Sequence, residues 1–186
     1  PAPAIENQTE LENNSSIDEY NKRLLELEKF ITSFKTKYPV SLISAEYRSE
    51  DFKEMAIGLE NEPERGGRCL KCFKMRLLRT AQYARERGIK VITTTLASSR
   101  WKSLDQINEA GRWACYNLDG TSDLDAGENI PGTSTILPQN EVIWWGHNWK
   151  KGGLQERRLQ IIKEYEFYNQ QYCGCEFSMR KDLCDK

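Results

Sequence analysis

Two closely spaced pairs of cysteines are the residues of this sequence best suited to chemistry. Cys69 and Cys72 form a CxxC motif, and Cys173 and Cys175 form a CxC motif near the end of the chain. Two intervening residues let both sulfurs of the first pair face one metal ion or cluster. The second pair can ligate a metal or close a strained, easily reduced disulfide. The two pairs therefore indicate metal or dithiol redox chemistry.

The other titratable candidates are isolated. Cys115 and Cys184 have no cysteine neighbour in the sequence, and His147 is the one histidine among 186 residues. A single histidine cannot build a histidine-rich metal centre, so we expect a structural role for all three residues. The sequence also contains no Walker-type phosphate loop and no nucleophile elbow, which argues against hydrolysis by those routes. Two tight pairs and two single cysteines favour a reducing compartment over a disulfide scaffold.

Positive charge is concentrated around the first cysteine pair. Residues 64–102 contain eleven basic and two acidic residues, although the whole chain has a net charge of −1. Two interpretations remain open, a solvated basic helix face or a docking surface for a polyanion such as nucleic acid. No apolar run is long enough to span a bilayer, and no signal peptide is visible. We therefore expect a cytoplasmic protein without a membrane partner.

The elements that must position these residues alternate between helix and strand. Helical periodicity predicts helices over 16–37, 71–87, 103–113 and 154–167, and a further helix that begins at Ser49. Apolar, β-branched runs predict strands over 40–45, 89–96 and 142–145. Gly88 is expected to end the helix over 71–87, and the Ser103 and Gln106 spacing predicts a capping box. Residues 1–14 are expected to be a loose arm, and residues 116–140 a long mobile loop.

This alternation predicts a single α/β domain over 1–186, with a mostly parallel sheet between helices in three layers, as in Rossmann-like folds. Ligands of such sheets bind at the carboxyl ends of the strands. The segment 98–102 directly follows the predicted strand over 89–96. We therefore expect Arg100, Trp101 and Lys102 to meet a ligand.

Longer stretches around the cysteine pairs point to a family. The chain resembles the cobalamin-independent epoxyqueuosine reductases (QueH) of queuosine biosynthesis, over about residues 14–180. The stretches that carry the resemblance are GLENEPE at 58–64, Arg68 with Cys69 and Cys72, TTTL at 93–96, SRWK at 99–102, QIN at 106–108, NWKKGG at 148–153 and FYNQQYCGCEFS at 167–178.

The resemblance implies that the epoxide on a modified wobble guanosine of tRNA is reduced to an alkene. It implies an iron–sulfur cluster of the 4Fe–4S type, leaves an additional iron open, and requires an electron donor that the sequence does not identify. Cys69 and Cys72 match cluster ligands. Cys173 and Cys175 match a redox-active pair, with contact to the metal centre as the alternative role. The expected substrate-binding residues are Arg68, Arg100, Trp101, Lys102, Gln170 and Tyr172.

One feature departs from the family pattern, and two other functions remain open. Family members begin with a strand that ends in adjacent cysteines, whereas no cysteine precedes Cys69 here.

The first alternative function is a zinc-stabilised RNA-binding module in which the paired cysteines hold structural zinc. The second is a metal-free thiol–disulfide oxidoreductase. Metal content separates all three functions.

Overall fold

The computed structural model describes residues 6–34, 37–119, 124, 142–168, 170 and 172–179. The chain divides into two compact units. The central unit comprises residues 54–156, and the terminal unit comprises residues 1–53 together with 157–186. Most of the predicted loop over 116–140 lies outside the described residues, as does Cys184.

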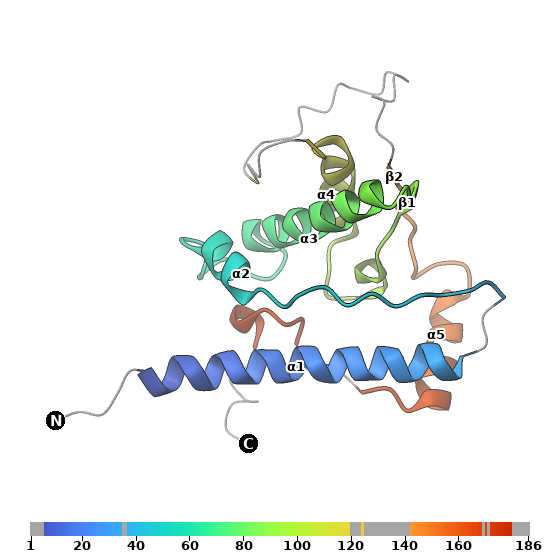
Figure 1. Ribbon diagram of the computed structural model, residues 1–186, viewed down its shortest axis with the longest axis horizontal. Helices are drawn as coiled ribbons and strands as arrows, with labels where there is room; N and C mark the ends of the chain where they lie inside the picture. The colour runs from blue at the N-terminus through green and yellow to red at the C-terminus, as the bar shows by residue number, and fades with distance from the viewer. Residues whose placement is uncertain are drawn as a thin grey trace. The chain divides into compact units, whose positions relative to one another are not determined.

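The central unit is built on two helices and a short parallel sheet. Helices α3 (Gly67–Glu86) and α4 (Leu104–Tyr116) pack against one another, and a 3-10 helix, η1 (Thr95–Ser98), precedes α4. Strands β1 (Val91–Ile92) and β2 (Ile143–Trp144) pair in parallel, with Val91 opposite Ile143 and Ile92 opposite Trp144. Figure 1 shows both strands beside the end of α3 that Gly88 follows.

The apolar stripes of α3 and α4 form the core of this unit. The predicted inward residues of α3 are all buried, namely Phe73, Leu77, Ala81 and Ala84. They pack with Ile107, Ala110 and Trp113 of α4. Gly111 lets the Trp144 ring approach the α4 backbone, since a Cβ atom there would overlap that ring. The parallel strand β2 is thereby fixed against α4.

Of the predicted helix signals in this unit, the Gly88 stop and the Ser103 cap are confirmed, whereas the Gln106 half of the capping box is not, because the Gln106 side chain donates to the Arg65 carbonyl instead. Gly88 follows α3 with φ +66°, a left-handed conformation that glycine adopts without strain. The Ser103 side chain precedes α4 and accepts a hydrogen bond of 3.4 Å from the Gln106 backbone N–H. Each helix therefore ends or begins where the local sequence predicts.

The terminal unit contains α1 (Glu6–Ser33), most of α2 (Ser49–Ala56) and of α5 (Leu154–Tyr165), and a short 3-10 helix, η2 (Glu176–Ser178). Aromatic rings join its helices. The Phe30 ring of α1 lies 5.3 Å from Tyr165 and 5.0 Å from Phe167, measured between centroids and in edge-to-face geometry. Such pairs add about 1 kcal/mol each beyond the buried area.

Several predicted elements differ from the structure. The segment 40–45 is not a strand, because no neighbouring strand in the described chain offers it a hydrogen-bonded ladder. The predicted strand over 89–96 is shortened to Val91–Ile92, since η1 begins at Thr95. Helix α1 extends back to Glu6, into the segment expected to be an arm.

The predicted α/β character is present in a weaker form than expected. The described sheet has two strands, which are parallel as predicted, and the described chain is mostly helical. No helix of the described residues is both long enough and apolar enough to cross a membrane.

Candidate functional site

The first cysteine pair lies in the opening turns of α3. Cys69 and Cys72 are three residues apart on this helix, so their side chains emerge on the same face, and both are half-buried. The Gly67 backbone N–H donates to a Glu62 carboxylate oxygen at 2.8 Å. The Arg65 backbone N–H donates to Cys69 Sγ at 3.4 Å. The helix start therefore presents two thiols with a backbone donor already directed at one of them.

Arg65 joins this helix start to the segment expected to bind substrate. Its guanidinium donates to the Arg100 carbonyl at 2.9 Å and to the Trp101 carbonyl at 3.2 Å. The Gln106 side-chain amide donates in turn to the Arg65 carbonyl at 2.8 Å. Arg65 has φ +69°, a left-handed backbone conformation that is uncommon for a residue with a side chain. These contacts hold Arg100 and Trp101 beside Cys69 within the central unit.

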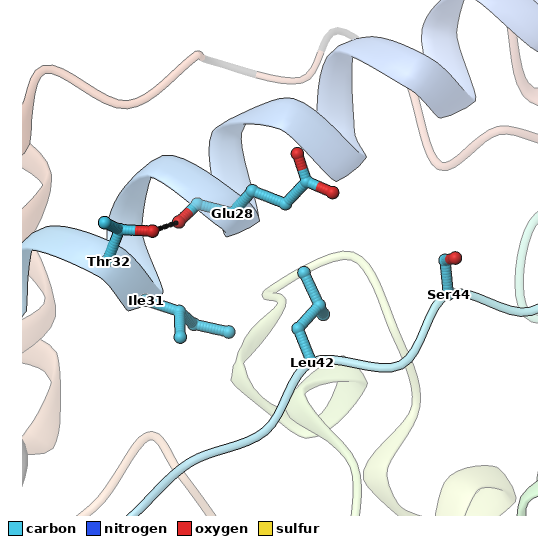
Figure 2. Close-up of a pocket in the computed structure, with 5 residues that line it drawn as sticks. All are labelled: Glu28, Ile31, Thr32, Leu42 and Ser44. Atoms are coloured by element: carbon cyan, nitrogen blue, oxygen red, sulfur yellow. Dashed lines mark hydrogen bonds between the residues drawn. The ribbon is translucent and has the colours of Figure 1, made fainter.

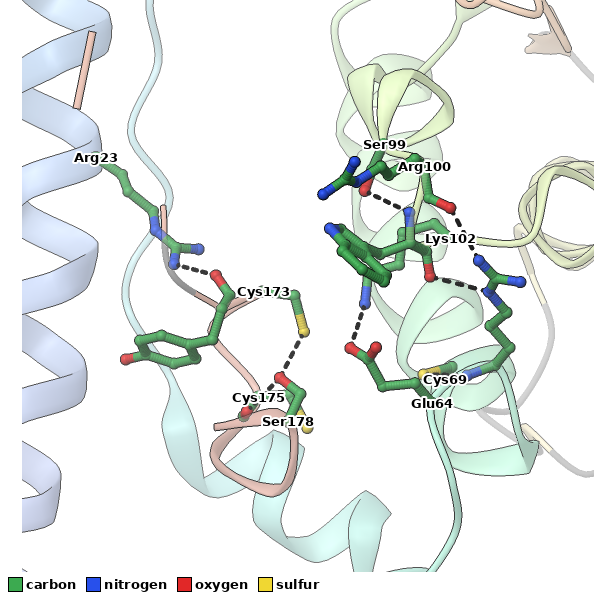
Figure 3. A network of polar contacts seen from close by, with 12 residues as sticks. Arg23, Glu64, Cys69, Ser99, Arg100, Lys102, Cys173, Cys175 and Ser178 are labelled. Carbon is green, nitrogen blue, oxygen red and sulfur yellow. Dashed lines mark hydrogen bonds and ion pairs between the residues drawn. The ribbon is translucent and has the colours of Figure 1, made fainter. Parts of the chain in front are cut away.

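The three predicted substrate-binding residues of this segment differ in exposure. The Trp101 ring is 46% exposed, and the Arg100 guanidinium lies over it at 4.6 Å. Lys102 is only 8% exposed, and its ammonium lies 3.6 Å from the Glu64 carboxylate (Figure 3). Arg100 and Trp101 therefore face solvent, whereas Lys102 has a local acidic partner.

Arg68 is the most deeply buried of the predicted binding residues, with 2% exposure. Its guanidinium donates to the carbonyls of Leu59 and Glu60 at 2.7 and 2.9 Å. In the structure this side chain closes the turn before α3. Its predicted role in substrate binding stays a prediction.

The second cysteine pair lies in a loop that leads into η2. Cys173 Sγ lies 3.1 Å from the Ser178 hydroxyl oxygen, and that hydroxyl donates to the Cys175 carbonyl at 2.7 Å (Figure 3). Because a serine hydroxyl has one proton, the Cys173 thiol is the donor in the first of these contacts. Gly174 has φ +91°, which allows the chain to turn between the two cysteines.

A polar network on α1 anchors this loop. Arg23 donates to the Tyr172 carbonyl at 2.9 Å and forms an ion pair with Glu19, its Nε lying 2.8 Å from Oε1. The Tyr168 hydroxyl donates to the other Glu19 carboxylate oxygen at 2.9 Å. A Cβ atom on Gly174 would lie 3.2 Å from the Arg23 guanidinium. The loop is thus packed directly on the arginine.

Burial and charge act together on the tyrosines of this network. Desolvation, followed by the neighbouring Glu19 carboxylate, raises the pKa of both Tyr168 and Tyr172 above the ordinary phenol value. Both phenols therefore keep their protons throughout the neutral range. Tyr172 is half-buried, and the other predicted substrate residue of this segment, Gln170, is exposed.

Sequence reasoning missed the residues that hold both sites in place. Arg65, Glu64 and Gln106 act through contacts to residues about 35 to 41 positions away, which no local pattern encodes. Glu19 and Arg23 carry a detectable signal, because acidic and basic residues four positions apart pair on one helix face.

The isolated candidates Cys115 and His147 have different surroundings in the central unit. Cys115 is buried in the core of the central unit, and desolvation raises the pKa of its thiol to about 11, as suits a structural cysteine. His147 is half-buried and its ring contacts two tryptophan rings. A cavity of about 250 Å³ in the terminal unit is lined by residues of α1 and by Leu42 and Ser44, with no thiol in its wall (Figure 2).

The described cysteines provide part of the ligand set that the implied cluster requires. A 4Fe–4S cluster takes four thiolates, and α3 supplies two at a suitable spacing. Within the described residues, no three His, Cys, Asp or Glu side chains come together as a metal site. The cysteines of α3 therefore fit one half of the ligand set.

Comparison with known proteins identifies the family. Residues 11–181 match the family model described as epoxyqueuosine reductase QueH. The chain belongs to the QueH family, which confirms the resemblance seen in the cysteine-containing stretches.

Proteins named epoxyqueuosine reductase QueH align with 90% of this chain. Those of Histophilus somni and Acinetobacter baylyi are each 37% identical over 167 residues, and that of Haemophilus influenzae is 36% identical over the same length. The alignments cover 60%, 66% and 59% of these relatives. The chain therefore spans about three fifths to two thirds of the length of the relatives it matches.

Proposed function

We propose that this chain carries out the reaction named for its family, the reduction of the epoxide of epoxyqueuosine, at the wobble position of tRNA. The observation that carries the proposal is the attachment of the Cys69 helix start to the exposed Arg100–Trp101 segment through Arg65. A thiol-bearing centre and a cationic, aromatic surface are thereby held together in one unit. Electron transfer and recognition of a nucleic acid require these two features.

The second cysteine pair supplies the electrons and protons that the reaction consumes. Conversion of an epoxide to an alkene breaks two C–O bonds, forms the C=C bond and releases the oxygen as water. It takes up two electrons and two protons. Oxidation of the Cys173 and Cys175 thiols to a disulfide provides both, and the proposed electron donor then reduces the disulfide. In support of this role, Cys173 Sγ lies 3.1 Å from the Ser178 hydroxyl oxygen, which can accept a hydrogen bond from the thiol.

Cys69 and Cys72 are proposed as two ligands of an iron–sulfur cluster of the 4Fe–4S type, and the proposal leaves open an additional iron in the same centre. When bound, the cluster supplies one-electron transfer. The N–H···S contact from Arg65 to Cys69 is of the kind that adjusts the potential of such centres.

The remaining proposals follow from the tRNA substrate. Arg100 and Trp101 contact phosphate and base, and Lys102, Arg68, Gln170 and Tyr172 complete the substrate-binding set. A tRNA substrate supports our proposal that the protein is cytoplasmic. The β1–β2 pair between α3 and α4 is proposed as part of a Rossmann-like sheet in a single functional domain.

The first test concerns the ligands. Cys69→Ser and Cys72→Ser are each expected to abolish iron and sulfide binding in anaerobically purified protein, because a hydroxyl is a poor ligand for iron. Cys115→Ala is the matched control, since it removes a buried thiol outside the pair. Normal iron and sulfide in both serine variants would remove these residues from the ligand set. Bound zinc in place of iron in the wild type would favour a structural RNA-binding module.

The second test concerns the redox pair. Cys173→Ser and Cys175→Ser are each expected to retain iron and to lose conversion of epoxyqueuosine in tRNA. Loss of iron together with activity would instead assign the pair to the metal centre. Full conversion by either variant would show that the pair takes no part in the reaction. Dithiol exchange without any bound metal would favour a thiol–disulfide oxidoreductase.

A further inference from the structure

Three rings of the central unit gather directly after strand β2. The His147 ring centroid lies 4.6 Å from that of Trp149 and 5.1 Å from that of Trp145. The two tryptophans are themselves 5.5 Å apart in edge-to-face geometry. These residues were not among the expected substrate contacts, and the proposed reaction does not use them.

A tight backbone turn builds this aromatic cluster. The Trp145 N–H continues the strand pairing by donating to the Ile92 carbonyl at 2.9 Å, and the His147 N–H then donates back to the Trp145 carbonyl at 3.0 Å. A Cβ atom on Gly146 would lie 2.6 Å from the Asn108 side-chain oxygen, so a larger residue at this position would require the Asn108 side chain to move. The turn brings alternate side chains together on one surface.

Hydrogen bonds fix the cluster to the carboxyl end of β1. The Thr93 hydroxyl donates to the Trp145 carbonyl at 2.9 Å, and the Trp149 indole N–H donates to the Thr94 carbonyl at 2.9 Å. The chain continues from Thr94 through η1 to the Arg100–Trp101 segment beside Cys69. The aromatic cluster therefore lies at the end of the parallel pair where ligands of such sheets bind.

Exposure and charge indicate what this surface can hold. Trp145 is 50% exposed, in contrast to Trp113 of the core, which is 2% exposed. Lys150 and Lys151 follow the cluster in a turn that the Asn148 side chain closes by accepting the Lys150 N–H at 3.0 Å. An exposed aromatic residue followed within a few positions by two cations suits a flat aromatic group that carries negative charge nearby, which is the chemistry of a nucleotide.

We propose that Trp145, His147 and Trp149 form a stacking site for an unpaired nucleobase of the RNA substrate, with Lys150 and Lys151 contacting the adjoining phosphates. The inference rests on the proposed function, and it assigns a second base-binding position besides Trp101. Trp145 offers the exposed ring face, while His147 and Trp149 support it from the side.

The test measures binding rather than turnover. A labelled anticodon stem-loop RNA without epoxyqueuosine is titrated with the anaerobically purified wild-type protein and with Trp145→Ala and Trp145→Phe. Loss of one base stack is expected to weaken binding about tenfold in Trp145→Ala, with most of the affinity kept in Trp145→Phe. Tyr116→Ala, which removes another exposed ring of the central unit, is the control and should bind as the wild type does.

Salt dependence and strand pairing separate stacking from general electrostatics. Trp145→Ala should lower affinity equally at each salt concentration, whereas Lys151→Ala should reduce the slope of log affinity against log salt by about one. A fully paired RNA of the same length should bind wild type and Trp145→Ala alike, because its bases are not available for stacking.

The outcomes are distinct from those that test the reductase. Equal stem-loop affinity of Trp145→Ala and wild type, or equal weakening for paired RNA, would overturn the stacking site. Failure of the wild type to reduce epoxyqueuosine, with the stem-loop results as expected, would overturn the proposed function alone.

Discussion

The two units hold their cysteine pairs by different forces. Every buried hydrophobic side chain among the described residues belongs to the central unit, where α3 carries Cys69 and Cys72 in its opening turns and Cys69 packs against the core. In the described part of the terminal unit, the buried side chain is a carboxylate, Glu19. Its Cys173–Cys175 loop is held by hydrogen bonds and an ion pair from α1.

This difference bears on how each pair responds to change. A helix packed through many apolar contacts loses its position only when the core itself is disrupted. A loop held by a few polar contacts moves when one of them is removed. Core substitutions should therefore act on the first pair, and single polar substitutions on the second.

The largest expected effect is that of Leu77→Ala in the core of the central unit. Leu77 is 3% exposed, and loss of its side chain should lower the free energy of unfolding by about 3 kcal/mol. All five tryptophans lie between residues 101 and 149, so urea unfolding followed by tryptophan fluorescence reports on this unit.

Leu24→Ala on α1 is the matched comparison, because Leu24 is only half-buried. It should leave the tryptophan transition where it is in the wild type. Equal shifts of that transition in both variants would contradict the view that the hydrocarbon core belongs to the central unit.

The next largest effect is expected for Glu19→Ala. This substitution leaves the Arg23 guanidinium and the Tyr168 hydroxyl without their shared acceptor, at a cost of about 2 kcal/mol. Amide hydrogen exchange of residues 166–179 should then accelerate about thirtyfold, while exchange of α3 stays unchanged. Glu28→Ala on the same helix should accelerate neither segment. Unchanged exchange in Glu19→Ala would show that the network does not hold the loop.

A smaller effect is expected for Gly174→Ala. The new Cβ atom would lie 3.2 Å from the Arg23 guanidinium, and alanine is strained at φ +91°. Together these effects should destabilise the loop by about 1 kcal/mol. Exchange at residues 172–178 should rise about fivefold. Gly152→Ala is the control, because it adds similar backbone strain at φ +68° while its new Cβ atom has no neighbouring atom within 4 Å. It should leave amide exchange at residues 172–178 unchanged.

The smallest effect at neutral pH concerns Cys115. Because burial raises its pKa from 9.0 to about 11, the folded state holds the thiol proton more tightly than the unfolded state does. This contribution to stability is fully present below pH 9 and is lost as the pH rises toward 11. At pH 8, iodoacetamide should label Cys115 in urea but not in the native protein, as mass spectrometry would show. Native labelling of Cys115 at the rate of the half-buried cysteines would contradict its burial.

The sequence predicted local structure well where a helix carries its own signals. Three such signals depend only on residues close together in the sequence: the apolar stripe through Phe73 and Leu77, the glycine after α3 and the Ser103 cap. The strand over 40–45 was wrong because a strand depends on a partner, which the segment itself does not specify.

The candidate site was predicted only in part, for a related reason. Residue type and spacing identified the cysteine pairs, and the stretches around them identified the family that comparison confirmed. The contacts that place them are side chain to backbone, such as Arg65 to the Arg100 carbonyl or Arg23 to the Tyr172 carbonyl. Every residue has a backbone carbonyl, so the residue type does not indicate which carbonyl accepts the hydrogen bond.

The Glu19–Tyr168 hydrogen bond has a consequence for synthesis of the chain. Its two residues are 149 positions apart, so the ribosome needs roughly 7–30 s to produce the second after the first. All of residues 54–156, with the first cysteine pair, have been translated by then. During that interval Glu19 lacks the Tyr168 hydroxyl as a donor, and the Cys173–Cys175 loop does not yet exist. The nascent chain thus meets its surroundings with one cysteine pair well before the other.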